Sequence, residues 1–499
     1  MQMTLRQLYK SYPGFIMGIG AIFICRLVIV FSMGLMPQDA YYYYYTRHLA
    51  LSYFDHPPMI AYLLYVYTSI FGNGVAAIKF ADFSTTLVSI FLFYKLSRRL
   101  LSHHRAMLAT VLLFSTLMVT ILSMVSTPDV PLILFWTLAL IYVHKALTDG
   151  LKRDWILSGV IIGFAFDSKY TAVFLLAGLF IFLLFTIHYR HYLFSRRSLL
   201  LIVGFLCAVS PVFIWNFAND WGSFGFQGSS RFSNIMALRL QPELTIGLIG
   251  HQLLILIPVL GLCTIYLLSR KARRLITGRR ISDQNRFLIA FSVPMLLFFG
   301  LLSPIYWIKL NWLMPAYIAG VILAAQYIRL KYVKWQMAVA VIFHLVLIVQ
   351  ILWYPVNIKS DDTWWGWEEF SEEVKKRVDE YPDCFLFSMD GYKTSAILSY
   401  YLEDKMVFSS NVIQENGLQF SVEHPCLDEY HGKNALFLDS EKRDLSEKGH
   451  KPPDPRLADF FNQIVELDPI LIRDKKENIL RKYYVYRCID YQPGCIEQD

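Results

Sequence analysis

The chain has 499 residues, of which 55% are hydrophobic and 17% charged, with a mean hydropathy of +0.41. Soluble proteins carry about 25% charged residues and disordered chains are poor in apolar ones, so the composition excludes both classes. The net charge of +8 divides into +19 over residues 1–354 (29 Lys and Arg, 10 Asp and Glu) and −11 over 355–499 (18 and 29). The basic balance therefore does not indicate nucleic-acid binding; it indicates a membrane region followed by an acidic tail.

Apolar runs of helical length recur through the first 354 residues. A helix needs about 20 mostly apolar residues to cross a bilayer. The predicted spans, about eleven transmembrane helices, are 14–36, 75–97, 106–124, 130–148, 155–166, 170–187, 198–218, 243–268, 286–303, 312–328 and 335–354. We separate 155–166 from 170–187 because one continuous helix would place Asp167 and Lys169 in lipid; the alternative is a single long helix with a buried ion pair.

Basic residues in the connecting loops, including the run from Arg270 to Arg286, fall mostly on one side of these spans. The positive-inside rule makes that side cytoplasmic, together with the N-terminus. Eleven spans then place residues 355–499 outside the membrane. The first apolar run has no clear cleavage site, so we expect it to remain as the first span.

Acidic residues are scarce before residue 355 and unevenly placed. Seven of the ten lie at or near the predicted outer surface, namely Asp39, Asp55, Asp82, Asp129, Asp167, Asp220 and Glu243. Ionisable groups at a membrane boundary are costly and mark functional sites by default. We therefore expect the functional site to lie at the outer surface. Arg26, inside the first span, is expected to pair with an outer acid such as Asp82.

Three short motifs at this surface have both structural and functional interpretations. Asp39 precedes five tyrosines and would cap a helix in an interfacial aromatic belt, or act in chemistry. Asp55 and His56 precede Pro57 and Pro58, which form an ordinary rigid turn or hold a phosphate or metal site. Asp129 begins the fourth span, where it can cap the helix or act as a second carboxylate.

The tail alternates short apolar runs with helical segments. Strands are predicted at 385–387, 406–408, 435–438, 470–472 and 483–486, with helices at 368–381 and 393–402. This pattern predicts a small α/β domain over 355–499. Cys384, Cys426, Cys488 and Cys495 permit two disulfides in three connectivities, and Cys488 and Cys495 are spaced to close a short loop.

Asp39 with its tyrosine-rich helix, Phe54-Asp55-His56-Pro57-Pro58 and Pro128-Asp129-Val130-Pro131 together resemble the protein-mannosyltransferase-like branch of the GT-C glycosyltransferases. That branch includes bacterial transferases that add aminoarabinose or galacturonic acid to lipid A. Four further segments match the pattern, namely 168–171, 223–227, 311–317 and 390–392.

This resemblance implies a polytopic α-helical GT-C enzyme of the bacterial inner membrane. It implies a transmembrane domain over 1–354 with outer loop helices at 39–72, and a periplasmic α/β domain over 355–499. Such enzymes transfer a sugar, usually with inversion, from a polyprenyl-phosphate donor to lipid A, another lipid, a polysaccharide or a protein.

The resemblance also implies roles for individual residues. Asp39 is the expected general base, and Asp129 supports it or the acceptor. Independently of the resemblance, the leaving phosphate develops negative charge and needs cations, and the few available on the outer side are His56, Lys169, Arg231 and Lys309. The aromatic residues that could line the site and stack on a sugar are Tyr42, Tyr306 and Trp307. Asp55 is expected at the phosphate or at a divalent metal ion. Headgroup contact and an interfacial belt are the alternatives for the cations and the aromatics.

Two other classes of function are compatible with a membrane protein of this kind. A transporter or flippase for a lipid-linked sugar would show repeated halves and ionisable groups near the midplane, whereas the acids here cluster at the outer ends. A scaffold that presents the acidic tail would leave the outer carboxylates dispensable. The transferase is the leading hypothesis.

Overall fold

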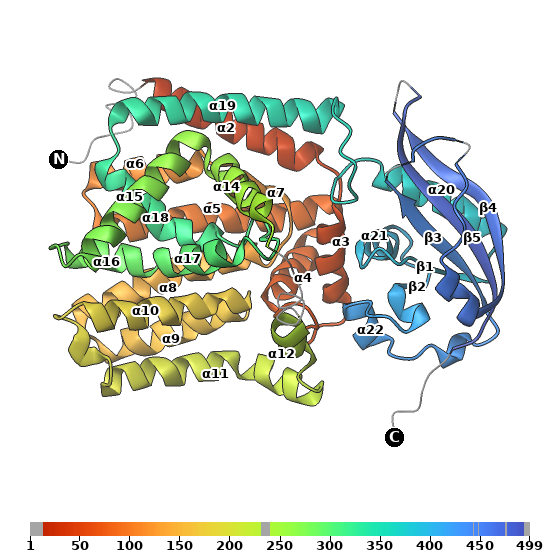
Figure 1. The fold of residues 1–499 in the computed structure, drawn as a ribbon, viewed down its shortest axis with the longest axis horizontal. Helices are drawn as coiled ribbons and strands as arrows, with labels where there is room; N and C mark the ends of the chain where they lie inside the picture. The colour runs from red at the N-terminus through yellow and green to blue at the C-terminus, as the bar shows by residue number, and fades with distance from the viewer. Residues whose placement is uncertain (1–12, 231–239, 443, 448, 475–476, 494–499) are drawn as a thin grey trace.

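The computed structural model describes residues 13–230, 240–442, 444–447, 449–474 and 477–493. A bundle of helices occupies one half of the molecule and a mixed β-sheet the other. The short helices α3 (Pro37–Tyr44), α4 (Met59–Phe71) and α12 (Gly222–Gly225) lie between them (Figure 1). The bundle helices are α2 (Pro13–Ser32), α5 (Val75–Leu100), α6 (His103–Phe114), α7 (Leu117–Met124), α8 (Asp129–Asp149), α9 (Lys152–Phe166), α10 (Val173–Phe185), α11 (Arg196–Ala218), α14 (Pro242–Leu256), α15 (Pro258–Ile276), α16 (Asp283–Ala290), α17 (Val293–Leu302), α18 (Met314–Tyr327) and α19 (Leu330–Trp353).

Each predicted span is helical in the structure, but the count of eleven is not established. Six continuous stretches of the described chain are long and apolar enough to cross a membrane, and the two bent pairs α6–α7 and α14–α15 raise this to eight. Three further apolar helices are shorter, at Met59–Phe71, Tyr170–Phe185 and Met314–Tyr327. The predicted break between 155–166 and 170–187 is confirmed, since α9 ends at Phe166 and α10 begins at Val173.

Two predicted single spans are bent instead. The predicted span 243–268 is not one continuous helix, because the chain bends by 114° between α14 and α15. The bend is at Ile257, where φ is +65°, immediately before Pro258, which lacks an N–H and restricts the residue before it. The Gln336 side chain donates to Leu256 O and accepts from Leu260 N, both at 3.0 Å, and so partners backbone groups at the break.

The predicted span 106–124 is also broken, by 60° between α6 and α7. Arg26 donates to the carbonyls of Phe114 and Thr116 and to the Thr120 hydroxyl at this bend. The expected pairing of Arg26 with Asp82 is therefore wrong. The guanidinium thus binds backbone carbonyls at the break between α6 and α7.

Glycines bring α9 and α11 into close contact. A Cβ atom on Gly159 would lie 1.9 Å from Leu201 O, and one on Gly163 would lie 2.4 Å from the Ala208 Cβ. Small residues four apart allow membrane helices to approach backbone to backbone. This contact fixes the end of α9, and with it the turn 167–169.

The tail forms the predicted α/β region. All five predicted strands are present, as β1 (Cys384–Phe387), β2 (Val407–Phe408), β3 (Asn434–Glu441), β4 (Phe461–Arg473) and β5 (Ile479–Tyr491), in the order β2-β1-β3-β5-β4. β1 is parallel to β2 and β3, and β5 is antiparallel to β3 and β4. The predicted helices are α20 (Trp367–Glu380) and α21 (Lys393–Tyr401), and a short α22 spans Gln419–Glu423.

The predicted short disulfide loop is wrong. Cys488 is a buried free thiol on β5, as is Cys384 on β1, whereas Cys426 is disulfide-bonded. Burial inside the sheet core raises the pKa of the Cys488 thiol above its ordinary value.

The sheet region and the outer helices share one apolar core. α3 (Pro37–Tyr44) contributes its tyrosines, α4 (Met59–Phe71) contributes Ile60 and Leu64, and the tail contributes residues such as Phe420 and Leu436. The rings of Tyr44 and Phe420 stack at 4.5 Å between centroids. The tyrosine run predicted as an interfacial belt is thus a buried helix between the bundle and the tail (Figure 1).

Candidate active site

A cavity of about 890 Å³ lies where the bundle, α3 and the tail meet. One part of its wall is apolar, with side chains that include Ile121, Val125, Phe174 and Phe298. The other part carries polar and charged groups, including His56, Asp129, Lys169, Lys309 and Asn311. Such a cavity can hold a molecule with a long apolar section and a charged end.

Asp129 is the carboxylate on the cavity wall. It is the first residue of α8 and is 1% exposed. Lys169 Nζ lies 3.0 Å from both of its oxygens, and Asn311 Nδ2 donates to Oδ2 at 2.5 Å. The turn after α9 supplies Lys169, so the helix break predicted from the sequence brings this cation to Asp129.

Asp39 is fully buried and is not among the described residues that line the cavity. Its Oδ2 accepts from Met36 N at 2.8 Å and pairs with Lys79 Nζ at 2.5 Å, and its Oδ1 accepts from Ser126 N at 2.7 Å. Lys79 also donates to Met124 O at 2.6 Å. The carboxylate therefore joins α3, α5 and the turn before α8, and its neighbours Gln38 and Tyr42 reach the cavity.

His56 lines the cavity, whereas the adjacent Asp55 is directed into the tyrosine cluster. Tyr41 donates to Asp55 Oδ1 at 2.9 Å, and Tyr45 donates to the same oxygen. Burial raises the pKa of the Asp55 carboxyl, while these two hydroxyls and the charge of Lys309 act in the opposite direction. The His56 ring packs edge-on against Tyr42 at 5.9 Å.

The residues around Asp55 do not suit a divalent metal ion, which was one of the two ligands considered for it. Within the described parts of the chain, no three His, Cys, Asp or Glu side chains are grouped to hold a metal. Asp55 Oδ1 is occupied by two tyrosine hydroxyls.

The remaining predicted residues divide into three groups. Lys309, Tyr42 and Tyr306 line the cavity. Trp307 is 60% exposed and is not among the described lining residues. Its ring centroid lies 6.1 Å from that of His251. Arg231 lies outside the described residues.

The structure adds cavity residues that the sequence did not assign. Asn311 and Tyr392 lie in segments noted only for their resemblance, and no sequence signal marked Gln38 or Trp364. Three buried polar atoms of lining residues have no hydrogen-bond partner in the described part of the chain: Gln38 Oε1, Thr171 Oγ1 and Trp364 Nε1.

Comparison with solved structures decides the fold. ArnT from Cupriavidus metallidurans superimposes in its apo state with a TM-score of 0.63 at 13% identity, covering 95% of this chain and 98% of ArnT. The chain has the GT-C glycosyltransferase fold. ArnT bound to undecaprenyl phosphate matches similarly, with a TM-score of 0.61 at 12% identity and the same coverage.

Sequence comparison agrees with this fold and confirms the resemblance. Residues 55–215 match the family described as dolichyl-phosphate-mannose-protein mannosyltransferase. The lipid A galacturonosyltransferase RgtD of Rhizobium johnstonii is 25% identical over 303 residues, which are 60% of this chain and 61% of RgtD. The chain thus aligns with less than two thirds of that relative's length.

Proposed function

We propose that this protein transfers a sugar from a polyprenyl-phosphate donor to an acceptor on the outer face of the bacterial inner membrane. The observation that carries the proposal is the cavity, which combines a long apolar wall with a carboxylate and several basic side chains. ArnT in complex with undecaprenyl phosphate has the same fold. The name of RgtD makes lipid A the first acceptor to test, ahead of another lipid, a polysaccharide or a protein.

In the proposed reaction an acceptor hydroxyl attacks the anomeric carbon of the donor sugar. The new C–O bond forms as the bond to the donor phosphate breaks, and the polyprenyl phosphate leaves with the electron pair. Lys309, Lys169 and His56, all on the cavity wall, would stabilise the charge on this phosphate. Attack opposite the leaving group inverts the anomeric configuration.

A carboxylate must take the proton of the acceptor hydroxyl. Asp129 is placed first because it lines the cavity, and it too would have to exchange a contact, with Lys169 or Asn311, for one with substrate. Asp39, the base predicted from the sequence, would need to exchange its contact with Lys79 or Ser126 for one with substrate. Asp39 remains the alternative base, because catalytic hydrogen bonds often form only when substrate is bound.

The proposed orientation of the protein in the membrane is inferred from its basic loops. The N-terminus and the Arg270–Arg286 run would face the cytoplasm, and the sheet region over 355–499 would lie in the periplasm. The cavity would then open at the outer leaflet.

The test is transfer by the protein in liposomes, with undecaprenyl-phosphate galacturonic acid as donor and lipid A as acceptor, read by mass spectrometry. Asp129→Asn should lower the rate about 10²–10⁴-fold. Asp220→Asn is the matched control, because this outer acid is not among the described residues lining the cavity. Full loss in Asp39→Asn with normal binding of undecaprenyl phosphate would assign the base to Asp39 instead.

Product analysis of cells extends the test to other sugars and acceptors. Glycolipids from cells with and without the protein should differ by one sugar unit. Movement of lipid-linked sugar across liposomes without any covalent product, and unchanged cellular glycans, would overturn the proposal and favour a transporter.

A further inference from the structure

A run of basic residues with no acid among them lies at the end of α15 and in the turn that follows. Between Ile257 and Ser282 the chain has no Asp or Glu and six basic residues, namely Arg270, Lys271, Arg273, Arg274, Arg279 and Arg280. The next acid along the chain, Asp283, pairs instead with His188 at 2.8 Å and with Arg286 at 3.1 Å. Within the described parts of the chain, none of the six forms an ion pair with an acidic side chain.

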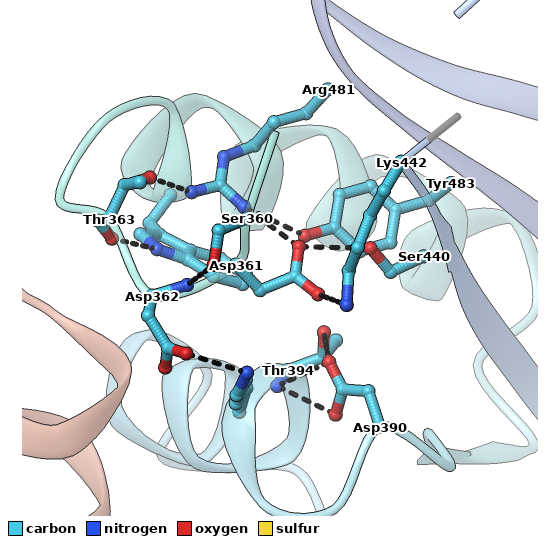
Figure 2. Close-up of polar contacts among 12 residues, drawn as sticks. Ser360, Asp361, Asp362, Thr363, Asp390, Thr394, Ser440, Lys442, Arg481 and Tyr483 are labelled. Carbon is cyan, nitrogen blue, oxygen red and sulfur yellow. Dashed lines mark hydrogen bonds and ion pairs between the residues drawn. The ribbon is translucent and has the colours of Figure 1, made fainter. Parts of the chain in front are cut away.

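Basic residues of the tail are arranged differently (Figure 2). Lys442 pairs with Asp361 at 2.6 Å, and Arg481 approaches the same carboxylate at 3.4 Å. Arg481 also donates to Thr363 Oγ1 at 2.6 Å and to Trp365 O at 2.7 Å, so its N–H groups are used within the chain. The guanidinium groups at the end of α15 have no such internal acceptors and are open to an anion from outside.

The six basic residues divide into one that supports the fold and five that reach the surface. Lys271 is buried and donates to the Tyr327 hydroxyl at 2.8 Å. The others are exposed or, in one case, half-buried: Arg270, Arg273, Arg279 and Arg280 are exposed and Arg274 is half-buried. Residues 270–280 therefore present a concentrated positive charge to the surroundings.

The contacts of Tyr327 fix the level of this surface in the bundle. Tyr327 is the last residue of α18, and its hydroxyl also accepts from Asn285 Nδ2 in the first turn of α16, at 3.0 Å. The ends of α15, α16 and α18 thus meet at the end of the bundle farthest from the sheet (Figure 1). α19 begins at Leu330 and exposes Tyr332 and Trp335 in its first turns. Tyrosine and tryptophan favour the headgroup layer, so the arginines lie at the level of lipid phosphates.

Exposed apolar side chains accompany the arginines. Leu262, Ile265 and Tyr266 are exposed along α15, and Ile276 in its last turn is 85% exposed. A nucleic acid or a soluble phosphate would leave these side chains in water. A phospholipid covers them with its acyl chains while it offers its phosphate to the arginines.

We propose that the end of α15 and the following turn bind anionic phospholipid, with Arg270, Arg273, Arg279 and Arg280 around the headgroup and Ile276 among the acyl chains. Arginine suits this partner because its fork of N–H groups binds phosphate oxygens in pairs. The proposal goes beyond the transferase function and does not depend on it, since none of these residues lines the cavity. It also goes beyond orientation by positive charge, which requires no lipid to remain bound to the folded protein.

The experiment measures lipid binding by the full-length protein in detergent, through the rise in unfolding temperature as lipid is added. The probes are phosphatidylglycerol, which is anionic, and phosphatidylcholine, which is zwitterionic, with identical acyl chains. The variant is Arg270→Gln with Arg273→Gln. Lys95→Gln with Arg98→Gln is the matched control, because it removes the same charge from exposed positions in the last turns of α5.

The wild-type protein should bind phosphatidylglycerol more tightly than phosphatidylcholine. Each arginine near an anionic lipid surface contributes about fivefold in affinity, so the double variant should bind phosphatidylglycerol about 25-fold more weakly. The control should keep the wild-type affinity, and neither variant should change the affinity for phosphatidylcholine.

Three results would overturn the proposal. The first is equal affinity of the wild-type protein for the two lipids, which does not rely on the variants being folded. The second is an equal loss of phosphatidylglycerol binding in the α5 control, which would indicate attraction to charge anywhere on this side of the bundle. The third is tighter binding of an RNA oligonucleotide than of phosphatidylglycerol, which would assign the arginines to nucleic acid.

Discussion

Asp39 and Lys79 form a buried ion pair at the base of the tyrosine helix, with exposed fractions of 0% and 1%. Every described contact of the Asp39 carboxylate is a hydrogen bond from the chain itself, and Lys79 also binds the last carbonyl of α7, that of Met124. Removing one partner of such a pair leaves an uncompensated charge in a low-dielectric interior. The pair therefore has structural consequences whatever part Asp39 has in chemistry.

We expect Lys79→Met to destabilise the protein by about 3–5 kcal/mol, because it leaves Asp39 charged and unpaired. The double variant Lys79→Met with Asp39→Asn should recover part of this loss, since neither charge remains. Thermal unfolding in detergent measures both. A double variant that is less stable than either single variant would show that the two residues act independently.

Glu423 provides a pH-dependent contribution to stability. Its side chain is 11% exposed. Burial raises the pKa of the carboxyl above its ordinary value, while the hydrogen bond from the Tyr44 hydroxyl and the charge of His48 lower it. A carboxyl with a raised pKa favours the folded state at low pH, and this contribution is lost as pH rises through the folded pKa. Glu423→Gln should therefore raise the unfolding temperature at pH 7–8, with the difference vanishing near pH 4.

Glu415→Gln is the control for this prediction, because the Glu415 carboxylate is exposed. Its unfolding temperature should follow the wild type from pH 4 to 8. A Glu423→Gln protein that is less stable than the wild type at pH 8 would contradict the assignment.

At the residue scale, the sequence predicted which residues belong to the site better than it predicted which of them touch. Asp129 and Lys169 were singled out separately, and they meet because a turn 40 residues away carries the lysine to the start of α8. Trp364 could not have been predicted, because a tryptophan next to a membrane span usually belongs to the interfacial belt. Its place on the cavity wall depends on contacts with residues of the sheet.

At the element scale, the close contact of α9 and α11 connects packing to the site. α9 ends in the turn that carries Lys169, and its glycines at 159 and 163 allow α11 to pack backbone to backbone. A side chain at position 159 would meet the backbone carbonyl of Leu201, which cannot move aside as a flexible side chain can. Separation of these helices would shift Lys169 relative to Asp129.

Gly159→Ala should lower stability by about 1–3 kcal/mol, the typical penalty of overpacking. It should also reduce transfer, because the Lys169 turn moves with α9. Gly20→Ala in α2 is the control, since a Cβ there meets no atom within 4 Å and alanine favours the helix. Thermal unfolding compares the two, and equal stabilities would show that the helices separate without cost.

The apolar pattern predicted where helices lie but not where they break. The break after Phe166 was foreseen because charged residues interrupt the apolar run. The bends at Ser115 and Ile257 interrupt runs with no charged residue near the break, and the groups that bind the backbone there, Arg26 and Gln336, come from distant helices. A single-sequence pattern carries no information about such partners.

At the scale of the whole molecule, the tail holds the loop that carries Asp55 and His56. Gln419 Oε1 accepts from Phe54 N at 2.9 Å, and Gln419 N donates to the Tyr41 hydroxyl at 3.3 Å. That hydroxyl in turn donates to Asp55. A chain of hydrogen bonds thus runs from α22 to Asp55, whose neighbour His56 lines the cavity.

We expect Gln419→Ala to increase amide hydrogen exchange in residues 50–58, because Phe54 N loses its partner. Glu415→Ala, four residues earlier on the exposed surface, is the control. Hydrogen–deuterium exchange with mass spectrometry resolves this peptide. Unchanged protection of 50–58 in the glutamine variant would show that the loop is held by the bundle alone.

The strands and helices of the tail were predicted correctly, but its relation to the bundle was not. The lipid interface was one of the two settings considered for the five tyrosines at 41–45. Each is instead at least 93% buried, in one core with residues of α4, α21 and α22. A run of tyrosines has the same composition in either setting. What decides between them is the apolar face of a domain more than 300 residues further along the chain.

The docking of the tail on α3 has a consequence for how relatives of this protein can exchange parts. Contacts at Gln38–Asp362 and Phe54–Gln419 each join residues separated by more than 300 positions. A chimera that takes the tail from a relative and keeps this tyrosine helix would place mismatched side chains at both joints. The helix and the tail would have to be exchanged together, although they are far apart in the sequence.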